Sequence, residues 1–142
     1  MNSLTLLNQL ACACLLCISA TLVGCGSDDP LNRQAVSGMV SLKGEPLDTG
    51  SISFEPKGDG TTVGGGATIT DGNFEIKQER GLPPGTYLVR VFSADEQGEK
   101  IEMPGESRKL APDRIPPEWN AASEQTIEVK DGDQNHFELK IP

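Results

Sequence analysis

The sequence predicts an all-β protein in which a single antiparallel β-sandwich of about seven strands follows an apolar N-terminal segment. From Val36 onward, apolar and polar residues alternate with the period of two that half-buried strands require. No later stretch shows the apolar spacing of three and four residues that marks an amphipathic helix. Turn sequences rich in glycine and proline divide the alternating stretches. The 142 residues suit one domain with a short appendage.

The predicted strands are bounded by these turn sequences. In chain order they cover residues 36–42, 51–55, 67–70, 73–76, 87–92, 127–129 and 137–141. Asp71-Gly72, between ATIT and NFEI, predicts a two-residue hairpin turn because both positions favour positive φ. All four phenylalanines fall in predicted strands, so we expect most of them in the core.

Two stretches are not predicted as strands. Residues 57–66 form a glycine-rich connection, and residues 95–125 form a long excursion that contains Trp119. Long connections without secondary structure of their own are commonly functional. The excursion is therefore the expected place for a ligand, with Trp119 as the candidate contact to a polysaccharide or a peptide. The alternative interpretation is that Trp119 packs on the sandwich and fixes the loop as a strap.

The N-terminal segment ends in a motif that predicts lipid attachment. All four cysteines lie within the first 25 residues, and Leu22-Val23-Gly24-Cys25 matches the bacterial lipobox. The match implies cleavage after Gly24, a diacylglycerol on the Cys25 thiol and acylation of the new amine. The alternatives are an uncleaved anchor or a chance match, and Met1-Asn2-Ser3 lacks the Lys or Arg that most signals carry. We predict a lipoprotein signal peptide at 1–24, a lipidated tether at 25–34 and the β-domain at 35–142.

Charge supports a covalent rather than an electrostatic attachment to a membrane. The formal net charge of −9 lies entirely in the acidic part of the chain that starts at Asp28. Such a surface repels nucleic acid and is not attracted to anionic lipid. One acyl chain binds a bilayer only marginally, whereas two or three hold it firmly. The predicted partners are the membrane, through the lipid on Cys25, and an envelope polysaccharide or protein.

Motifs in the predicted strands resemble a known family. Three stretches are similar to the carboxypeptidase regulatory-like domains, also described as transthyretin-like or prealbumin-like: VSGMVSLKGEPLDTGSISFEP, TDGNFEI and GLPPGTYLVRV. The tail from IPPEWN to FELKI resembles the ending of small lipoproteins of planctomycete-type bacteria, with Trp119 where those usually have Tyr. The resemblance covers about residues 35–141 and implies a seven-stranded Greek-key sandwich. It implies no catalysis, because these domains are appended to peptidases, transporters and surface proteins.

Residues for catalysis are sparse. Hydroxyisourate hydrolases, the enzymes among transthyretin-like proteins, are recognised by several histidines, an arginine and a C-terminal Tyr-Arg-Gly-Ser. This chain has one histidine, His136, predicted to point outward, and it ends in LKIP. The serines at 37, 41, 51 and 53 have no neighbouring base implied by the sequence, and no Gly-x-Ser-x-Gly elbow occurs. We predict a non-catalytic protein without a cofactor, and a hydroxyisourate-hydrolase-like enzyme remains the catalytic alternative.

Metal binding has one weak candidate. Asp131, Asp133 and Asn135 have the alternating oxygen spacing with which a calcium loop begins. His136 replaces the glycine of such a loop and Pro142 stands in place of its bidentate glutamate, so the stretch is not an EF-hand. A polar hairpin is the simpler interpretation.

The sequence therefore predicts a lipid-anchored, extracytoplasmic envelope protein, facing the periplasm or the cell surface, with a structural or binding domain.

Overall fold

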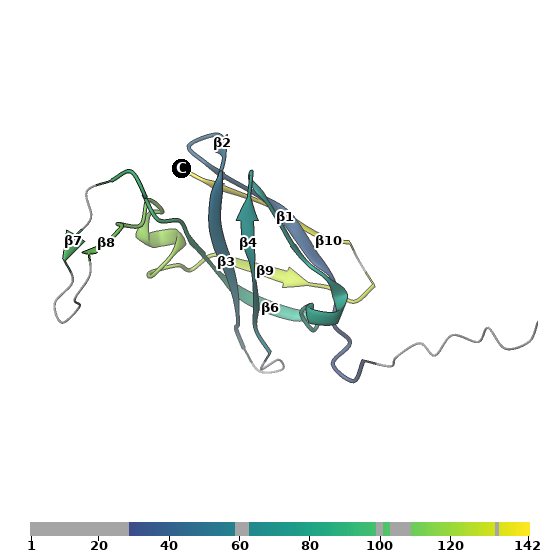
Figure 1. Ribbon diagram of the computed structural model, residues 1–142. Coiled ribbons are helices and arrows are strands. Elements are labelled where there is room, and N and C mark those ends of the chain that lie inside the picture. The colour runs from purple at the N-terminus through teal and green to yellow at the C-terminus, as the bar shows by residue number, and fades with distance from the viewer. Residues whose placement is uncertain (1–28, 59–62, 99–100, 103–108, 133) are drawn as a thin grey trace, which may run out of the picture.

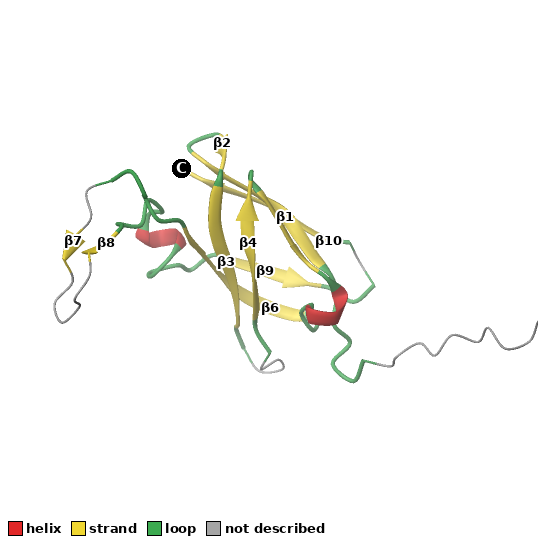
Figure 2. Ribbon diagram, in the orientation of Figure 1, coloured by secondary structure: helices red, strands yellow, loops and turns green. Residues whose placement is uncertain are grey.

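The computed structural model describes residues 29–58, 63–98, 101–102, 109–132 and 134–142. The predicted signal peptide, Gly24, Cys25 and the calcium candidate Asp133 therefore lie outside the described residues. Across the described part of the chain, the secondary structure is β, with two short 3-10 turns and no α-helix (Figure 2). The prediction of an all-β protein is confirmed.

The strands are short and follow one another along the chain. They are β1 (Val36–Leu42), β2 (Glu45–Pro46), β3 (Thr49–Pro56), β4 (Gly65–Thr70), β5 (Asn73–Ile76), β6 (Gly85–Phe92), β7 (Ile101–Glu102), β8 (Lys109–Leu110), β9 (Thr126–Val129) and β10 (Asn135–Ile141). The 3-10 turns are η2 (Gln78–Arg80) and η3 (Pro117–Trp119). The seven strands of the main path correspond to the predicted ones, whereas β2, β7 and β8 were not predicted.

The main sheet curls into a half-barrel. Its strands are paired in the order β10-β1-β5-β4-β3-β6-β9, and β2 adds to β1 (Figure 1). All pairs along this path are antiparallel except β1 and β10, which run parallel with Val36 opposite Asn135. The prediction of wholly antiparallel pairing is wrong at this pair. The reason is that the chain, after leaving β9, joins the sheet at the end where β1 begins.

The concave side of the curl holds the hydrophobic core. Alternate positions of β6 are fully buried, at Tyr87, Val89 and Val91, as the period of two predicts. The core contains Val36, Val40, Leu47, Ile52, Phe54, Ile69, Phe74, Ile76, Leu82, Tyr87, Val89, Val91, Ile115, Ile127, Val129, Leu139 and Ile141.

The aromatic residues divide between the core and the outer surface. The Phe54 and Phe74 rings are buried with their centroids 5.8 Å apart, and Phe137 is partly buried against the core. Phe92 is 38% exposed because the inward positions of β6 are taken by its alternate neighbours. The expectation that most phenylalanines belong to the core is confirmed, with Phe92 as the exception.

The turns follow the expected chemistry. Asp71 and Gly72 have φ values of 49° and 79°, which confirms the predicted hairpin turn between β4 and β5. The Pro83-Pro84-Gly85 turn before β6 is held by the buried Tyr87, whose hydroxyl donates a hydrogen bond of 2.8 Å to the Pro83 carbonyl. This bond satisfies the only polar group of a side chain that is otherwise surrounded by core residues.

Residues 29–34 are folded onto the domain. The Asp29 carboxylate accepts hydrogen bonds from the backbone N–H groups of Leu31 at 3.1 Å and Arg33 at 2.8 Å. These bonds, with the Arg33 guanidinium beside the carboxylate, lower the pKa of Asp29. Gln34 then pairs with Leu82 through two backbone hydrogen bonds. This part of the predicted tether is a capped turn at the end of the sheet where β1 begins.

Candidate functional site

A groove with a mixed polar and apolar lining crosses the outer, convex face of the sheet and is the candidate site. It consists of adjoining hollows of about 430, 360 and 660 Å³. The first two share Ser37, Glu75 and His136, and the last two share Thr68 and Glu75. We call this surface the outer groove. It is lined by Gln34, Ser37, Ser51, Ser53, Gly66, Ala67, Thr68, Thr70, Asn73, Glu75, Gln78, Arg80, Phe92, Gln134, Asn135 and His136, among others.

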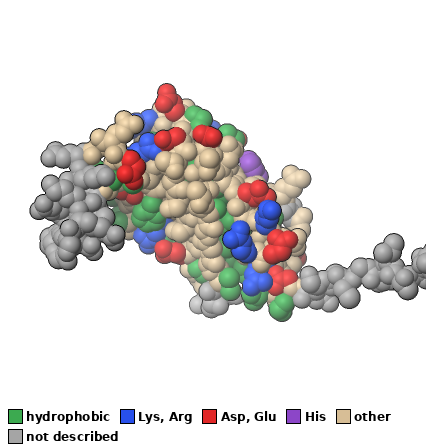
Figure 3. Space-filling view, viewed as in Figure 1, with side chains coloured by type: hydrophobic (Ala, Val, Ile, Leu, Met, Phe, Trp, Pro, Cys, Tyr) green, Lys and Arg blue, Asp and Glu red, His purple; other side chains and the backbone are tan. Residues whose placement is uncertain are grey.

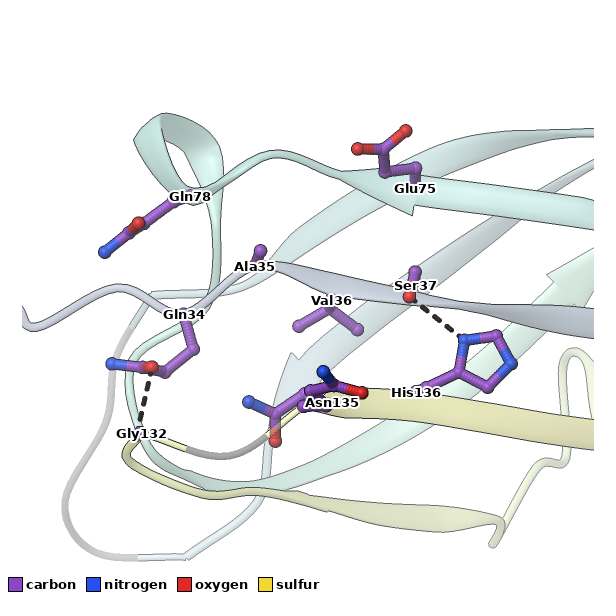
Figure 4. Close-up of a pocket in the computed structure, with 10 residues that line it drawn as sticks. Gln34, Ala35, Val36, Ser37, Glu75, Gln78, Gly132, Asn135 and His136 are labelled. Atoms are coloured by element: carbon purple, nitrogen blue, oxygen red, sulfur yellow. Dashed lines mark hydrogen bonds between the residues drawn. The ribbon is translucent and has the colours of Figure 1, made fainter.

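Strand register brings Ser37, His136 and Glu75 into one row. Ser37 of β1 lies opposite His136 of β10 on one side and opposite Glu75 of β5 on the other. The Ser37 Oγ is 3.1 Å from the His136 Nδ1, whereas the Glu75 side chain points away from this pair (Figure 4). Both groups of the Ser37–His136 pair face the groove and are accessible from solvent.

This geometry does not form a Ser-His-acid triad. A triad needs the carboxylate on the second nitrogen of the histidine, but here the serine stands between the histidine and Glu75. Within the described residues, the His136 ring makes its hydrogen bond to Ser37. The pair can donate and accept hydrogen bonds to a bound molecule, and nothing in the described residues arranges it as a nucleophile with an oriented base.

The end of the groove next to the β9–β10 turn is fixed by amide side chains. The Asn135 Oδ1 accepts a hydrogen bond of 2.8 Å from the Lys130 backbone N–H, and its Nδ2 donates one of 3.0 Å to the Lys130 carbonyl. The Gln34 Nε2 lies 3.3 Å from an Asp131 carboxylate oxygen, and the Gln34 Oε1 accepts from the Gly132 N–H at 3.3 Å. Figure 4 shows the Gln34 and Asn135 side chains beside the hollow.

The calcium candidates are placed around this same turn. Asn135 is buried and its amide is bonded to the backbone of Lys130, while Asp131 is exposed. Asp133 lies outside the described residues. In the described part of the chain, no group of three or more His, Cys, Asp or Glu side chains could hold a metal ion. The interpretation as a polar hairpin is wrong, because β9 pairs with β6 and β10 pairs with β1 at the opposite end of the sheet order. The residues form a polar connection between the two strands, held by the Asn135 side chain.

Trp119 lies away from the outer groove. It belongs to η3, is partly buried and packs against the hydrophobic core. The chain after η3 is fixed to β6, because Arg90 Nη1 donates hydrogen bonds of 3.0 and 2.7 Å to the carbonyls of Asn120 and Ala121. The buried Ser123 hydroxyl donates a bond of 2.6 Å to the Val89 carbonyl. These contacts match the strap interpretation of Trp119, and its role in ligand binding stays a prediction.

The 95–125 excursion is also fixed to the sheet at Arg114. The Arg114 guanidinium bonds to the Asp48 carboxylate, and its Nε donates a hydrogen bond of 2.8 Å to the Ser93 hydroxyl. That hydroxyl donates a bond of 2.6 Å to the Thr49 carbonyl, and Ser93 is only 2% exposed. The hydrogen bond from Arg114 holds the pKa of Asp48 below its usual value. The excursion is therefore joined to the start of β3 by a network that contains the Arg114–Asp48 ion pair.

We expect the Asp48→Asn variant to have a lower melting temperature than wild type near neutral pH, and this difference to disappear in acid. Because the pKa of folded Asp48 is lowered, its contribution is complete above the unfolded pKa of about 3.9 and is lost as pH falls through the folded pKa. Thermal unfolding of both chains between roughly pH 6 and pH 2.5 measures this convergence. Glu138→Gln removes an equal charge from an exposed side chain of β10 and is the control. A difference that persists undiminished in acid would contradict the role of the Asp48 carboxylate.

No protein-family model, no curated protein and no solved structure matches this chain. Within the described residues, no helix has the length and apolar character needed to cross a bilayer.

The Ser37–His136 pair is the part of the site that sequence reasoning missed. The two residues are 99 positions apart, and only the parallel pairing of β1 and β10 places them side by side. The alternation around each residue predicted that both point outward, but it carried no information about which strands are neighbours.

Proposed function

We propose that this protein is an exported lipoprotein, anchored to a bacterial membrane through Cys25, whose β-domain has a non-catalytic binding role at the cell envelope. The observation that carries the proposal is the sequence Leu22-Val23-Gly24-Cys25 immediately before an acidic, folded domain. The net charge of −9 supports it, because an acidic domain is not attracted to anionic lipid and a covalent lipid would supply the attachment.

The position of Asp29 supports a short tether. Residues 26–28 separate Cys25 from the capped turn that begins at Asp29. At about 3.3 Å per residue, the lipidated residue can lie at most about 13 Å from that turn. The end of the sheet at which β1 begins would then face the membrane. The β7–β8 hairpin, at the opposite end of the molecule in Figure 1, would point away from it.

The domain itself is proposed to be a Greek-key sandwich of the carboxypeptidase regulatory-like kind. Its support is the resemblance of the β1–β3, β4–β5 and β6 sequences, together with the Asp71-Gly72 hairpin turn that the motif requires. A non-catalytic role is supported by the position of Glu75, on the wrong side of Ser37 for a triad. The outer groove offers hydrogen-bonding groups rather than reactive ones.

The test is the intact mass of the full-length gene product purified from membranes of a native or related host. We expect a wild-type species that begins at Cys25 and carries the mass of a diacylglycerol and an acyl chain. The Cys25→Ser variant should keep residues 1–24 and lack the lipid mass, because the thiol is the acceptor. Cys17→Ser is the matched control and should be processed as wild type. An unmodified full-length wild type, or lipid mass on Cys25→Ser, would refute the anchor.

A further inference from the structure

We infer that the outer groove is a binding site for an uncharged polysaccharide chain that lies across the strands. This assignment concerns the sheet face, and it is independent of both the lipid anchor and the Trp119 excursion. It begins with the strand register, which aligns side chains from neighbouring strands into a single row.

The row spans six adjacent strands. Ser51 of β3 lies opposite both Phe92 of β6 and Thr68 of β4. The pairing of Thr70 with Asn73 places Thr68 opposite Glu75, and Ser37 continues the row from Glu75 to His136. Neighbouring strands are about 4.8 Å apart, so the row from Phe92 to His136 extends for roughly 24 Å. That length suits a chain molecule rather than a single small ligand.

The side chains of Ser51 and Thr68 in the row are short and carry neutral hydroxyl groups. Gly66 has no side chain over the largest hollow, and Ser51 and Thr68 present hydroxyls beside it. In Figure 3, uncharged side chains and backbone cover the centre of this face, and the acidic and basic side chains gather around it. Glu75 is the one carboxylate in the row, on a chain with 21 acidic residues and a net charge of −9.

This chemistry favours a polyol over other partners. The cores of protein interfaces are apolar and aromatic, whereas, among the described residues, Phe92 is the one exposed large apolar side chain that lines these hollows. An anionic polymer would be repelled by Glu75 and by the net charge. Sugar hydroxyls both donate and accept hydrogen bonds, as serine, threonine and amide groups do. Phe92, at one end of the row, offers an apolar face to the C–H surface of a sugar ring.

The test is retention of the detergent-purified full-length protein on insoluble neutral polysaccharides: cellulose, chitin and β-1,3-glucan. We expect at least one of them to retain wild type, and charged polygalacturonate gel to retain it at least tenfold less. Thr68→Glu adds a charge to the middle of the row, and Phe92→Ala removes its aromatic end. Each should lower retention at least tenfold.

The controls match each change. Thr126→Glu adds the same charge on exposed β9, outside the row, and Leu31→Ala removes an apolar side chain that is 38% exposed, like Phe92. Both should bind as wild type does, with all melting temperatures measured alongside. If Thr68→Glu does not fold, Phe92→Ala carries the test. Failure of all three neutral polymers to retain wild type, equal loss in a control, or preference for polygalacturonate would overturn the assignment.

Discussion

Replacing Gly38 by alanine is expected to lower the free energy of unfolding by about 2–3 kcal/mol, the cost typical of an overpacked core. A Cβ at this position would lie 2.2 Å from the Phe137 carbonyl oxygen and 2.7 Å from the Phe74 ring. The first clash is with the backbone of β10, so a side-chain rotation cannot relieve it. Relief requires β1 and β10 to separate, which disrupts the parallel pair that closes one side of the half-barrel. Urea unfolding of both chains measures the difference.

Ser41→Val is the matched control for this prediction. Ser41 lies on the same strand, is partly exposed, and gains two carbon atoms on a side chain that already has a Cβ. We expect its midpoint to change little, because valine is well suited to a strand. Equal stability of Gly38→Ala and wild type would show that β1 and β10 are not packed as closely as the structure places them.

Sequence periodicity was sufficient to predict the strands of the main path, because each buries one face. The alternation in residues 36–42 and 87–92 and the Asp71-Gly72 turn all have local physical causes, and each prediction holds. The two-residue strands β2, β7 and β8 are too short to show a period. The parallel direction of β10 could not be predicted either, since parallel and antiparallel strands share the period of two.

The candidate site was less accessible to sequence reasoning than the fold. The outer groove depends on register, because a slip of one residue in any strand would turn its outward side chains toward the core. Taken singly, Ser37 and Thr68 are ordinary solvent-facing strand residues. Only the strand register, which aligns them in one row, makes them part of the outer groove. The sequence instead directed attention to the excursion at 95–125. The described C-terminal part of the excursion is hydrogen-bonded to the sheet. Arg114 and Ser123 of the excursion donate to the sheet side, and Arg90 of β6 donates to the excursion.

The Phe54→Ala variant should lose about 3–5 kcal/mol of unfolding free energy, more than any other single substitution proposed for this chain. Phe54 lies in the middle of β3, between β4 and β6, and is 2% exposed. Truncation removes its transfer free energy and leaves a cavity next to the Phe74 ring, 5.8 Å away between centroids. If wild type has the usual stability of 5–15 kcal/mol, the variant keeps only a small margin. Urea unfolding at 25 °C measures the loss.

Phe92→Ala makes the same chemical change on the outer face of the sheet. Comparing its loss of stability with that of Phe54→Ala separates the effect of burial from the effect of removing a phenylalanine ring. Its ring is 38% exposed, so we expect a loss below about 1 kcal/mol. The Phe54–Phe74 contact can then be isolated with Phe74→Leu and the double variant, for which a coupling of about 0.5–1.5 kcal/mol is expected. Similar losses for Phe54→Ala and Phe92→Ala would mean that the inside and outside of the sheet are wrongly assigned. The register on which the outer groove depends would then fail as well, because the two side chains face opposite sides of the same two paired strands.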